Sequence, residues 1–267
     1  MTAAADRQVG ALVAVSALAG RSLRRMARNP EALGVTLAFP AVFLAIAQAS
    51  LGGVAGLLPG FKAGSYVQFA MAGTLVLSAV ATGVNAGADL AADLQAGIVD
   101  RILLAPAGRA ALLAGAAAGP VALVAAQAVL YLCGAGLIGS HFATGPAGGL
   151  ALVVLVAAVA VTFCAIGATL ALRTGSAQVV LASFPAFFVL MTFSTFLLPR
   201  ELIPARWFRD IATVNPLSSF IEAGRSLAVD GWRAGVLARG WGVLLACLVA
   251  AGLAAEASLR RRTRGAP

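Results

Sequence analysis

Residues 150–172 read LALVVLVAAVAVTFCAIGATLAL, an apolar run that contains no charged side chain. A helix needs about 20 mostly apolar residues to cross the ~30 Å hydrocarbon core of a bilayer. This run meets that length, and Arg173 follows it directly, where headgroups or water can solvate the charge. The stretch therefore predicts a membrane-spanning helix.

The composition of the whole chain agrees with a membrane location. Hydrophobic residues make up 61% of the 267 residues and charged residues only 11%, whereas a soluble domain carries about a quarter charged residues. The formal net charge is +9. Because the charges cluster at the ends of apolar runs, they indicate contact with anionic membrane lipid and disfavour a nucleic-acid-binding surface.

The same length criterion predicts five further spans along the chain. The six predicted spans cover residues 33–54, 66–86, 110–138, 150–172, 177–198 and 236–255. We expect an all-α integral membrane protein in which residues 33–257 form one domain of six transmembrane helices. Residues 1–32 would precede it as a cytoplasmic interfacial segment, and residues 258–267 would follow as a basic cytoplasmic tail.

The N-terminal segment carries four arginines spaced for one face of a helix. They fall at i, i+3, i+4 and i+7, and are Arg21, Arg24, Arg25 and Arg28. The spacing predicts an amphipathic helix in the cytoplasmic interface, with its arginines near lipid phosphates. Two alternatives stay open, an ordinary solvated basic face and a signal peptide with residues 9–19 as its apolar region.

The distribution of basic residues between the predicted loops indicates the orientation of the chain. Arg101, Arg109 and Arg173 fall on the side of the N-terminal arginines, as does the arginine-rich tail. On the opposite side, the first loop carries Lys62 and the second carries no lysine or arginine. Because short cytoplasmic loops are enriched in positive charge, we expect both termini to be cytoplasmic. The longer segment 199–235 has five arginines and four acids, and long segments follow this rule weakly.

Segment 199–235 on the outer side does not read as a plain loop. Trp207, Phe208 and Ile211 are spaced like one side of a helix, and Asn215-Pro216 breaks the pattern before a semi-apolar stretch resumes. We expect two short amphipathic helices that dip into the outer leaflet. The alternative is an outer-surface cap without a role in transport.

The loop between the second and third predicted spans is charged and broken by a glycine. Residues 93–109 read DLQAGIVDRILLAPAGR. A solvated turn would not require its apolar residues, so the loop indicates a surface for a cytoplasmic partner. Lys62 is the sole lysine and does not lie in a phosphate-binding G-x-x-x-x-G-K-[ST] motif, so ATP would have to be bound by another chain.

Three patterns in this chain resemble ABC-2 type exporter permeases, most closely the daunorubicin-resistance type. They occur in the order that the family requires, and together they cover nearly the whole sequence. The patterns are Arg21-x-x-Arg24…Arg28-Asn29-Pro30, Asp93-x-x-x-Gly97-x-x-Asp100-Arg101-x-x-x-x-Pro106-x-x-Arg109, and Phe196-x-x-Pro199…Pro204-x-x-Trp207…Asn215-Pro216…Arg225…Gly231.

The resemblance implies a non-enzymatic half-transporter of a bacterial cell membrane that pairs with itself or with a similar permease. It implies two separate cytoplasmic ATPase subunits, which would hold the ATP and Mg, and no cofactor in this chain. The exported molecule would be drug-like or lipid-like, as in multidrug and antibiotic resistance. An ATP-independent carrier or channel and a membrane scaffold stay open as alternatives. The residues implied to couple to the ATPase are Asp93, Gly97, Asp100, Arg101, Pro106 and Arg109.

A substrate path is expected along the fifth predicted span, where aromatic and polar side chains recur. Aromatic walls with scattered polar groups suit an amphipathic, ring-bearing molecule, although helix packing would use the same residues. The candidates are Gln178, Phe184, Phe187, Phe188 and Phe193. The single histidine and the isolated cysteines form no catalytic or metal-binding pattern. Other polar residues are expected at membrane depth, where they would either line a path or form hydrogen bonds between helices. They are Gln48, Gln68, Asn85 and Gln127.

Overall fold

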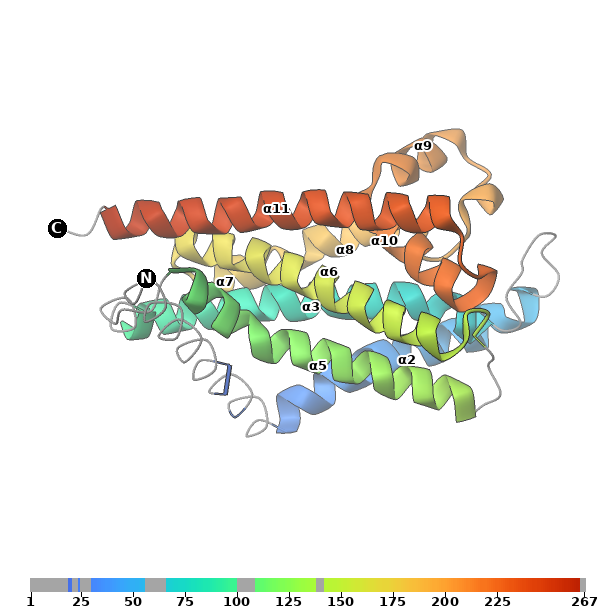
Figure 1. Ribbon diagram of the computed structural model, residues 1–267, viewed down its shortest axis with the longest axis horizontal. Helices are drawn as coiled ribbons and strands as arrows, with labels where there is room; N and C mark the ends of the chain where they lie inside the picture. Colours follow the sequence, from blue (N-terminus) through green and yellow to red (C-terminus); the bar gives the residue numbers. More distant parts are fainter. Residues whose placement is uncertain are drawn as a thin grey trace, which may run out of the picture.

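The computed structural model describes residues 19–20, 24, 30–55, 66–99, 109–137 and 142–264. Every regular element within these ranges is helical. Five long helices run along the long axis of the molecule, with α2 inclined to the others (Figure 1). They are α2 (Pro30–Ala55), α3 (Tyr66–Gln95), α5 (Arg109–Leu137), α6 (Gly145–Thr174) and α11 (Ala234–Arg264).

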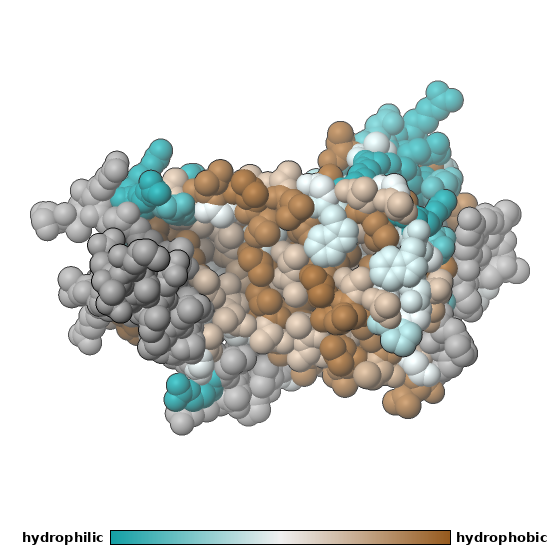
Figure 2. Space-filling model, viewed as in Figure 1, coloured by the Kyte–Doolittle hydropathy of each residue, from teal (hydrophilic) through white to brown (hydrophobic). Residues whose placement is uncertain are grey.

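The prediction of six spans is confirmed for four of them. Within the described residues, α3, α6, α5 from Leu113 and α11 are long and apolar enough to cross a membrane. Two shorter apolar stretches, Pro40–Gly53 and Ala177–Thr192, coincide with the first and fifth predicted spans. These two are not confirmed as spans. Figure 2 shows apolar side chains across the middle of one face and hydrophilic ones toward its ends, as a bilayer requires.

The predicted fifth span is not one helix. It divides into α7 (Ala177–Leu181) and α8 (Phe184–Thr192). Pro185 has no N–H to donate to the carbonyl of Leu181, where α7 ends, and Ser183 Oγ instead donates to the Val180 carbonyl at 2.6 Å. Ala182 and Ser183, between the two helices, keep right-handed helical backbone angles, so the interruption is local.

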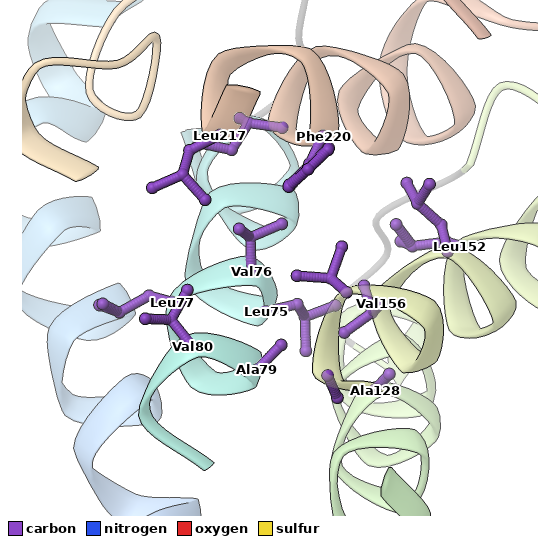
Figure 3. Close-up of a cluster of buried hydrophobic side chains, with 14 of the residues drawn as sticks. Leu75, Val76, Leu77, Ala79, Val80, Ala128, Leu152, Val156, Leu217 and Phe220 are labelled. Carbon is purple, nitrogen blue, oxygen red and sulfur yellow. The ribbon is translucent and has the colours of Figure 1, made fainter. Parts of the chain in front are cut away.

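The central element of the bundle is α3, which packs mainly against α6 and α2 and is buried over most of its length. Its apolar side chains meet those of α5, α6 and α10 in one cluster (Figure 3). The crossing with α6 is close because glycine faces glycine there. A Cβ atom added to Gly87 would lie 2.6 Å from the backbone of Gly167, so a larger residue at this crossing would separate the helices.

The outer segment forms two short helices, as the sequence predicted, but they have different surroundings. They are α9 (Arg206–Val214) and α10 (Pro216–Arg225), and a π-helical turn, Ser226–Asp230, follows them. The peripheral helix α9 keeps Trp207 and Ile211 exposed. In contrast, α10 lies among α3, α6 and α11, and most of its residues are buried. It is therefore an internal helix of the bundle rather than a surface helix.

Two helices extend beyond the predicted spans. The second predicted span ended at residue 86, but α3 continues to Gln95 and carries Asp89 and Asp93 on the same helix. The last predicted span ended at residue 255, but α11 continues to Arg264. The described part of the predicted basic tail, residues 258–264, is therefore helical and continuous with α11. Helices continue past the apolar core because the headgroup region tolerates charge.

Candidate functional site

The predicted coupling loop, residues 93–109, begins at one end of the bundle, at the C-terminal end of α3. Asp93 lies in the last turn of α3, Gly97 lies in the turn that follows, and Ile98 and Val99 are helical again. Asp100, Arg101 and Pro106 lie outside the described residues. Arg109 is the first residue of α5. The described residues thus locate both arms of the loop at the same end.

Gly97 ends α3 through its backbone conformation. Its φ of 68° lies in the left-handed region, and its N–H donates to the Leu94 carbonyl at 3.1 Å. A Cβ atom on Gly97 would meet no atom of this chain within 4 Å. Within this chain, the left-handed turn is what requires a glycine at this position.

Val99 anchors the start of the loop in a buried apolar cluster. Its exposed fraction is 1%, and it packs with residues of α3, α6, α7 and α11. Leu113 of α5, beyond the loop, packs against the same cluster. We call this group the inner cluster, and its fully buried members include Ala91, Val99, Ala171, Val180 and Leu259. Both arms of the loop therefore rest on one packed unit.

Two side-chain hydrogen bonds connect the helix ends around the inner cluster. Gln95 Nε2 donates to the Gly175 carbonyl at 2.8 Å, which ties the end of α3 to the cap of α6. Arg173 Nε donates to Ser258 Oγ at 3.1 Å, which ties α6 to α11. The ends of these three helices are therefore held together beside the coupling loop.

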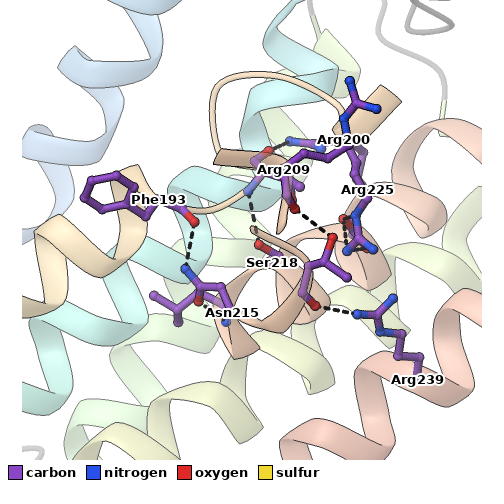
Figure 4. A network of polar contacts seen from close by, with 11 residues as sticks. Phe193, Arg200, Arg209, Asn215, Ser218, Arg225 and Arg239 are labelled. Carbon is purple, nitrogen blue, oxygen red and sulfur yellow. Dashed lines mark hydrogen bonds and ion pairs between the residues drawn. The ribbon is translucent and has the colours of Figure 1, made fainter. Parts of the chain in front are cut away.

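At the opposite end of the bundle, a buried arginine organises the outer segment (Figure 4). Arg225 on α10 is 7% exposed, and its Nη2 donates to the Thr195 carbonyl at 2.9 Å and to that of Phe196 at 3.4 Å. Its Nε donates to the Phe69 carbonyl of α3 at 3.4 Å. Arg225 thus joins α10, the segment after α8 and the start of α3.

Arg225 remains charged at neutral pH despite its burial. Burial lowers the pKa of its guanidinium to about 10, and the nearby carboxylate of Glu222 opposes this shift. Glu222 itself is held by Arg200, whose Nη2 donates to its two carboxylate oxygens at 2.8 and 3.0 Å. The sequence pattern included Arg225, but its role was not predicted. A single arginine in the semi-apolar stretch 217–227 was the available signal.

Asn215 joins α9 and α10 to the end of α8. Its Oδ1 accepts a hydrogen bond from the Leu217 N–H at 3.0 Å, as expected for a residue that caps α10. Its Nδ2 donates to the carbonyls of Leu190 at 2.7 Å and Phe193 at 3.1 Å. The Asn215-Pro216 break predicted from sequence is therefore also a contact between distant segments.

The polar residues at membrane depth mostly bond helices together. Gln48 Oε1 accepts from the Val67 N–H at 3.0 Å, and Gln68 Nε2 donates to the Ala228 carbonyl at 2.8 Å. Gln127 accepts from the Ser78 hydroxyl and donates to Tyr131 Oη at 3.3 Å. These contacts fit the packing alternative for the three glutamines. Asn85, in contrast, is exposed on α3.

The candidate path residues do not converge on one point. Gln178 is exposed on α7, and the Phe187 ring packs edge-on against Phe163 of α6 with 5.4 Å between centroids. Phe184 and Phe188 pair with each other at 6.3 Å. Phe193 instead joins Trp207 and Phe208 near the outer end. The five residues therefore take part in separate contacts on α7, on α8 and at the residue that follows α8.

The predicted interfacial helix lies mostly outside the described residues, which include none of Arg21, Arg25 and Arg28. Arg24 is described and exposed, and its Nε donates to the Gly20 carbonyl at 3.0 Å. Within the described ranges, no three or more metal-ligating side chains lie together so as to hold an ion.

Comparison with known families agrees with this architecture. The model of the ABC-2 type transporter family matches residues 13–228, which include the coupling loop and α10. The chain belongs to the ABC-2 type transporter family. No curated protein matches the sequence significantly.

Membership of this family defines the protein as a multi-pass membrane permease. An ABC-2 permease is a transport subunit without catalytic activity of its own, and it pairs with an ABC ATPase. The inner cluster, where the predicted coupling loop begins, and the Arg225 network therefore lie at opposite ends of a transport subunit.

Proposed function

We propose that this ABC-2 permease is an exporter subunit that receives the motion of its ATPase through residues 93–109. The observation that carries this proposal is the anchoring of the loop in the inner cluster by the buried Val99. A partner that displaces the loop would thereby displace the attached helix ends as well. The proposed contact residues are Asp93, Gly97, Asp100, Arg101, Pro106 and Arg109.

The orientation that follows has the loop and the end of α11 in the cytoplasm. Arg260, Arg261 and Arg262 lie at this end of α11, and the positive-inside rule supports a cytoplasmic location for them. The segment with α9 and α10 then faces outward. We propose a bacterial cell membrane as the location.

The proposed substrate is an amphipathic molecule of the drug-like or lipid-like class, as transported by the daunorubicin-resistance type. The rings of Phe184, Phe187 and Phe188 on α8 support an aromatic component in the substrate. Exposed apolar side chains on α5, such as Leu130 and Leu137, support contact with lipid or a second permease chain. We propose that two permease chains form the transport unit.

Co-purification with the ATPase tests the proposal. The chain is expressed with ATPases encoded in the same genome, purified by its own tag, and assayed for bound ATPase and ATP hydrolysis. We expect Asp100→Arg to release the ATPase while the permease stays folded. Gly97→Trp should release it as well, because the left-handed backbone at Gly97 disfavours any side chain and the loop would change its path. Asp210→Arg makes the same charge change on the exposed helix α9 at the opposite end and is the matched control. Transport by the purified chain without any ATPase would contradict the proposal and support an ATP-independent carrier.

A further inference from the structure

We propose that Leu259 and Val99 carry the motion of the coupling loop to α11, and that α11 carries it to α10 at the outer end. This inference rests on the proposed coupling function of residues 93–109. It extends that function from the two helices that flank the loop to the last helix of the chain.

The first step of the route is the inner cluster. Val99 is 1% exposed and Leu259 is fully buried, and both belong to this one group of packed side chains. Because a packed protein interior contains few voids, a displaced Val99 must move its neighbours or open a costly cavity. The contact between Arg173 and Ser258, the residue before Leu259, keeps α11 in register with α6 at this point.

The second step is α11 itself. It is a continuous helix from Ala234 to Arg264 with no proline to interrupt it. Leu259 and Gly240 are separated by 19 residues, which corresponds to about 28 Å along a helix axis. A helix of this length, packed along α6 and α10, transmits a tilt or translation from one end to the other.

The third step is the crossing of α11 with α10. Gly240 is buried, and a Cβ atom added to it would lie 2.4 Å from the Ala223 Cβ and 2.9 Å from the Ser219 carbonyl oxygen. The two helices are therefore in direct backbone contact. Two residues after Ala223 on α10, Arg225 donates hydrogen bonds to the carbonyls of Thr195, Phe196 and Phe69. A shift of α11 thus reaches the residues that hold the outer end together.

The experiment measures the accessibility of α10 when the inner cluster is altered. In a chain with Cys133→Ser, Cys164→Ala and Cys247→Ala, the reporter Ser219→Cys is placed on α10, where Ser219 is 4% exposed. The permease is purified with the ATPase that co-purifies with it. The rate of maleimide labelling is then compared without nucleotide and with ATP plus vanadate, which traps the ATPase.

We expect trapping to change the labelling rate by about five-fold or more, the lower end of typical coupling between sites. Leu259→Ala should remove this response while the ATPase stays bound and hydrolyses ATP. Leu259→Met, which conserves volume, should retain it. Leu253→Ala on the same helix is the matched control, because Leu253 is 62% exposed and outside the inner cluster. If Leu259→Ala does not accumulate in membranes, Val99→Ala provides the same test.

A response that survives Leu259→Ala and Val99→Ala overturns the inference, as does a complex that hydrolyses ATP without any change at Ser219→Cys. Loss of the response in Leu253→Ala as well would also overturn it, because the effect would not depend on the inner cluster. Failure of any ATPase to co-purify is a separate result that contradicts the proposed function itself.

Discussion

The guanidinium carbon of Arg225 lies 3.6 Å from the centre of the Phe69 ring, so a charge on α10 rests on the face of an aromatic side chain of α3. A cation is attracted to a ring face, most strongly where water is excluded. The same guanidinium bonds three backbone carbonyls. This arrangement allows a short helix with a permanent charge to lie inside the bundle.

Replacing Arg225 by Met should destabilise the outer end of the permease. Met keeps much of the length of the side chain but removes the guanidinium that donates to the Thr195, Phe196 and Phe69 carbonyls. It also leaves Glu222 without a nearby buried cation. We expect the free energy of unfolding to fall by about 2–4 kcal/mol, the combined effect of lost charged hydrogen bonds and the ring contact. The measurement is thermal unfolding of the purified protein. Arg233→Met, at a side chain that is 55% exposed, should change stability little.

Replacing Asn215 by Asp separates its two structural roles. The carboxylate can still accept from the Leu217 N–H, but it cannot donate to the carbonyls of Leu190 and Phe193. We expect faster proteolysis between α8 and α9, with a loss of about 1–3 kcal/mol for the unsatisfied carbonyls. Asn215→Ser should behave similarly. If both variants resist the protease as the wild type does, the hydrogen bonds to Leu190 and Phe193 do not stabilise this segment and only the cap on α10 does.

Replacing Gly87 by Ala should separate α3 from α6. The added methyl group would lie 2.6 Å from the Gly167 backbone, and neither helix can yield without a shift of its neighbours. We expect a loss of about 1–3 kcal/mol, as for other overpacked cores, measured by unfolding in mild detergent. Gly134→Ala on α5 is the matched control, because its Cβ would meet no atom within 4 Å. Equal stability of the two variants would contradict the role of this crossing.

Trp207 should lie in the membrane interface if α9 rests on the outer leaflet. Its side chain is 61% exposed and belongs to an aromatic group with Phe193 and Phe208. In a variant with Trp232→Phe and Trp241→Phe, we expect quenching by lipids brominated near the headgroup and weaker quenching by lipids brominated near the chain end. Strong quenching by aqueous iodide, with no quenching by either lipid, would place α9 in water instead.

Several features of the fold were predictable because they depend on neighbouring residues alone. The run 150–172 is apolar enough to identify α6 without knowledge of any partner. The Asn215-Pro216 break is also local, because proline lacks an N–H and asparagine caps a helix. The interruption between α7 and α8 is partly local as well, because Pro185 has no N–H to donate to the preceding turn. A second cause of this interruption is the hydrogen bond that Ser183 Oγ donates to the Val180 carbonyl, which caps the end of α7.

The sequence by itself therefore determined that the chain is a helical membrane protein with a charged loop after its second predicted span. Only the tertiary structure decided that α10 lies inside the bundle and that Val99 and Leu259 share one buried cluster. The difference arises because a hydropathy pattern depends only on residues that are neighbours in the sequence. The burial of Arg225, in contrast, depends on carbonyls supplied by distant segments, and the position of α10 depends on the space that Gly240 leaves on another helix.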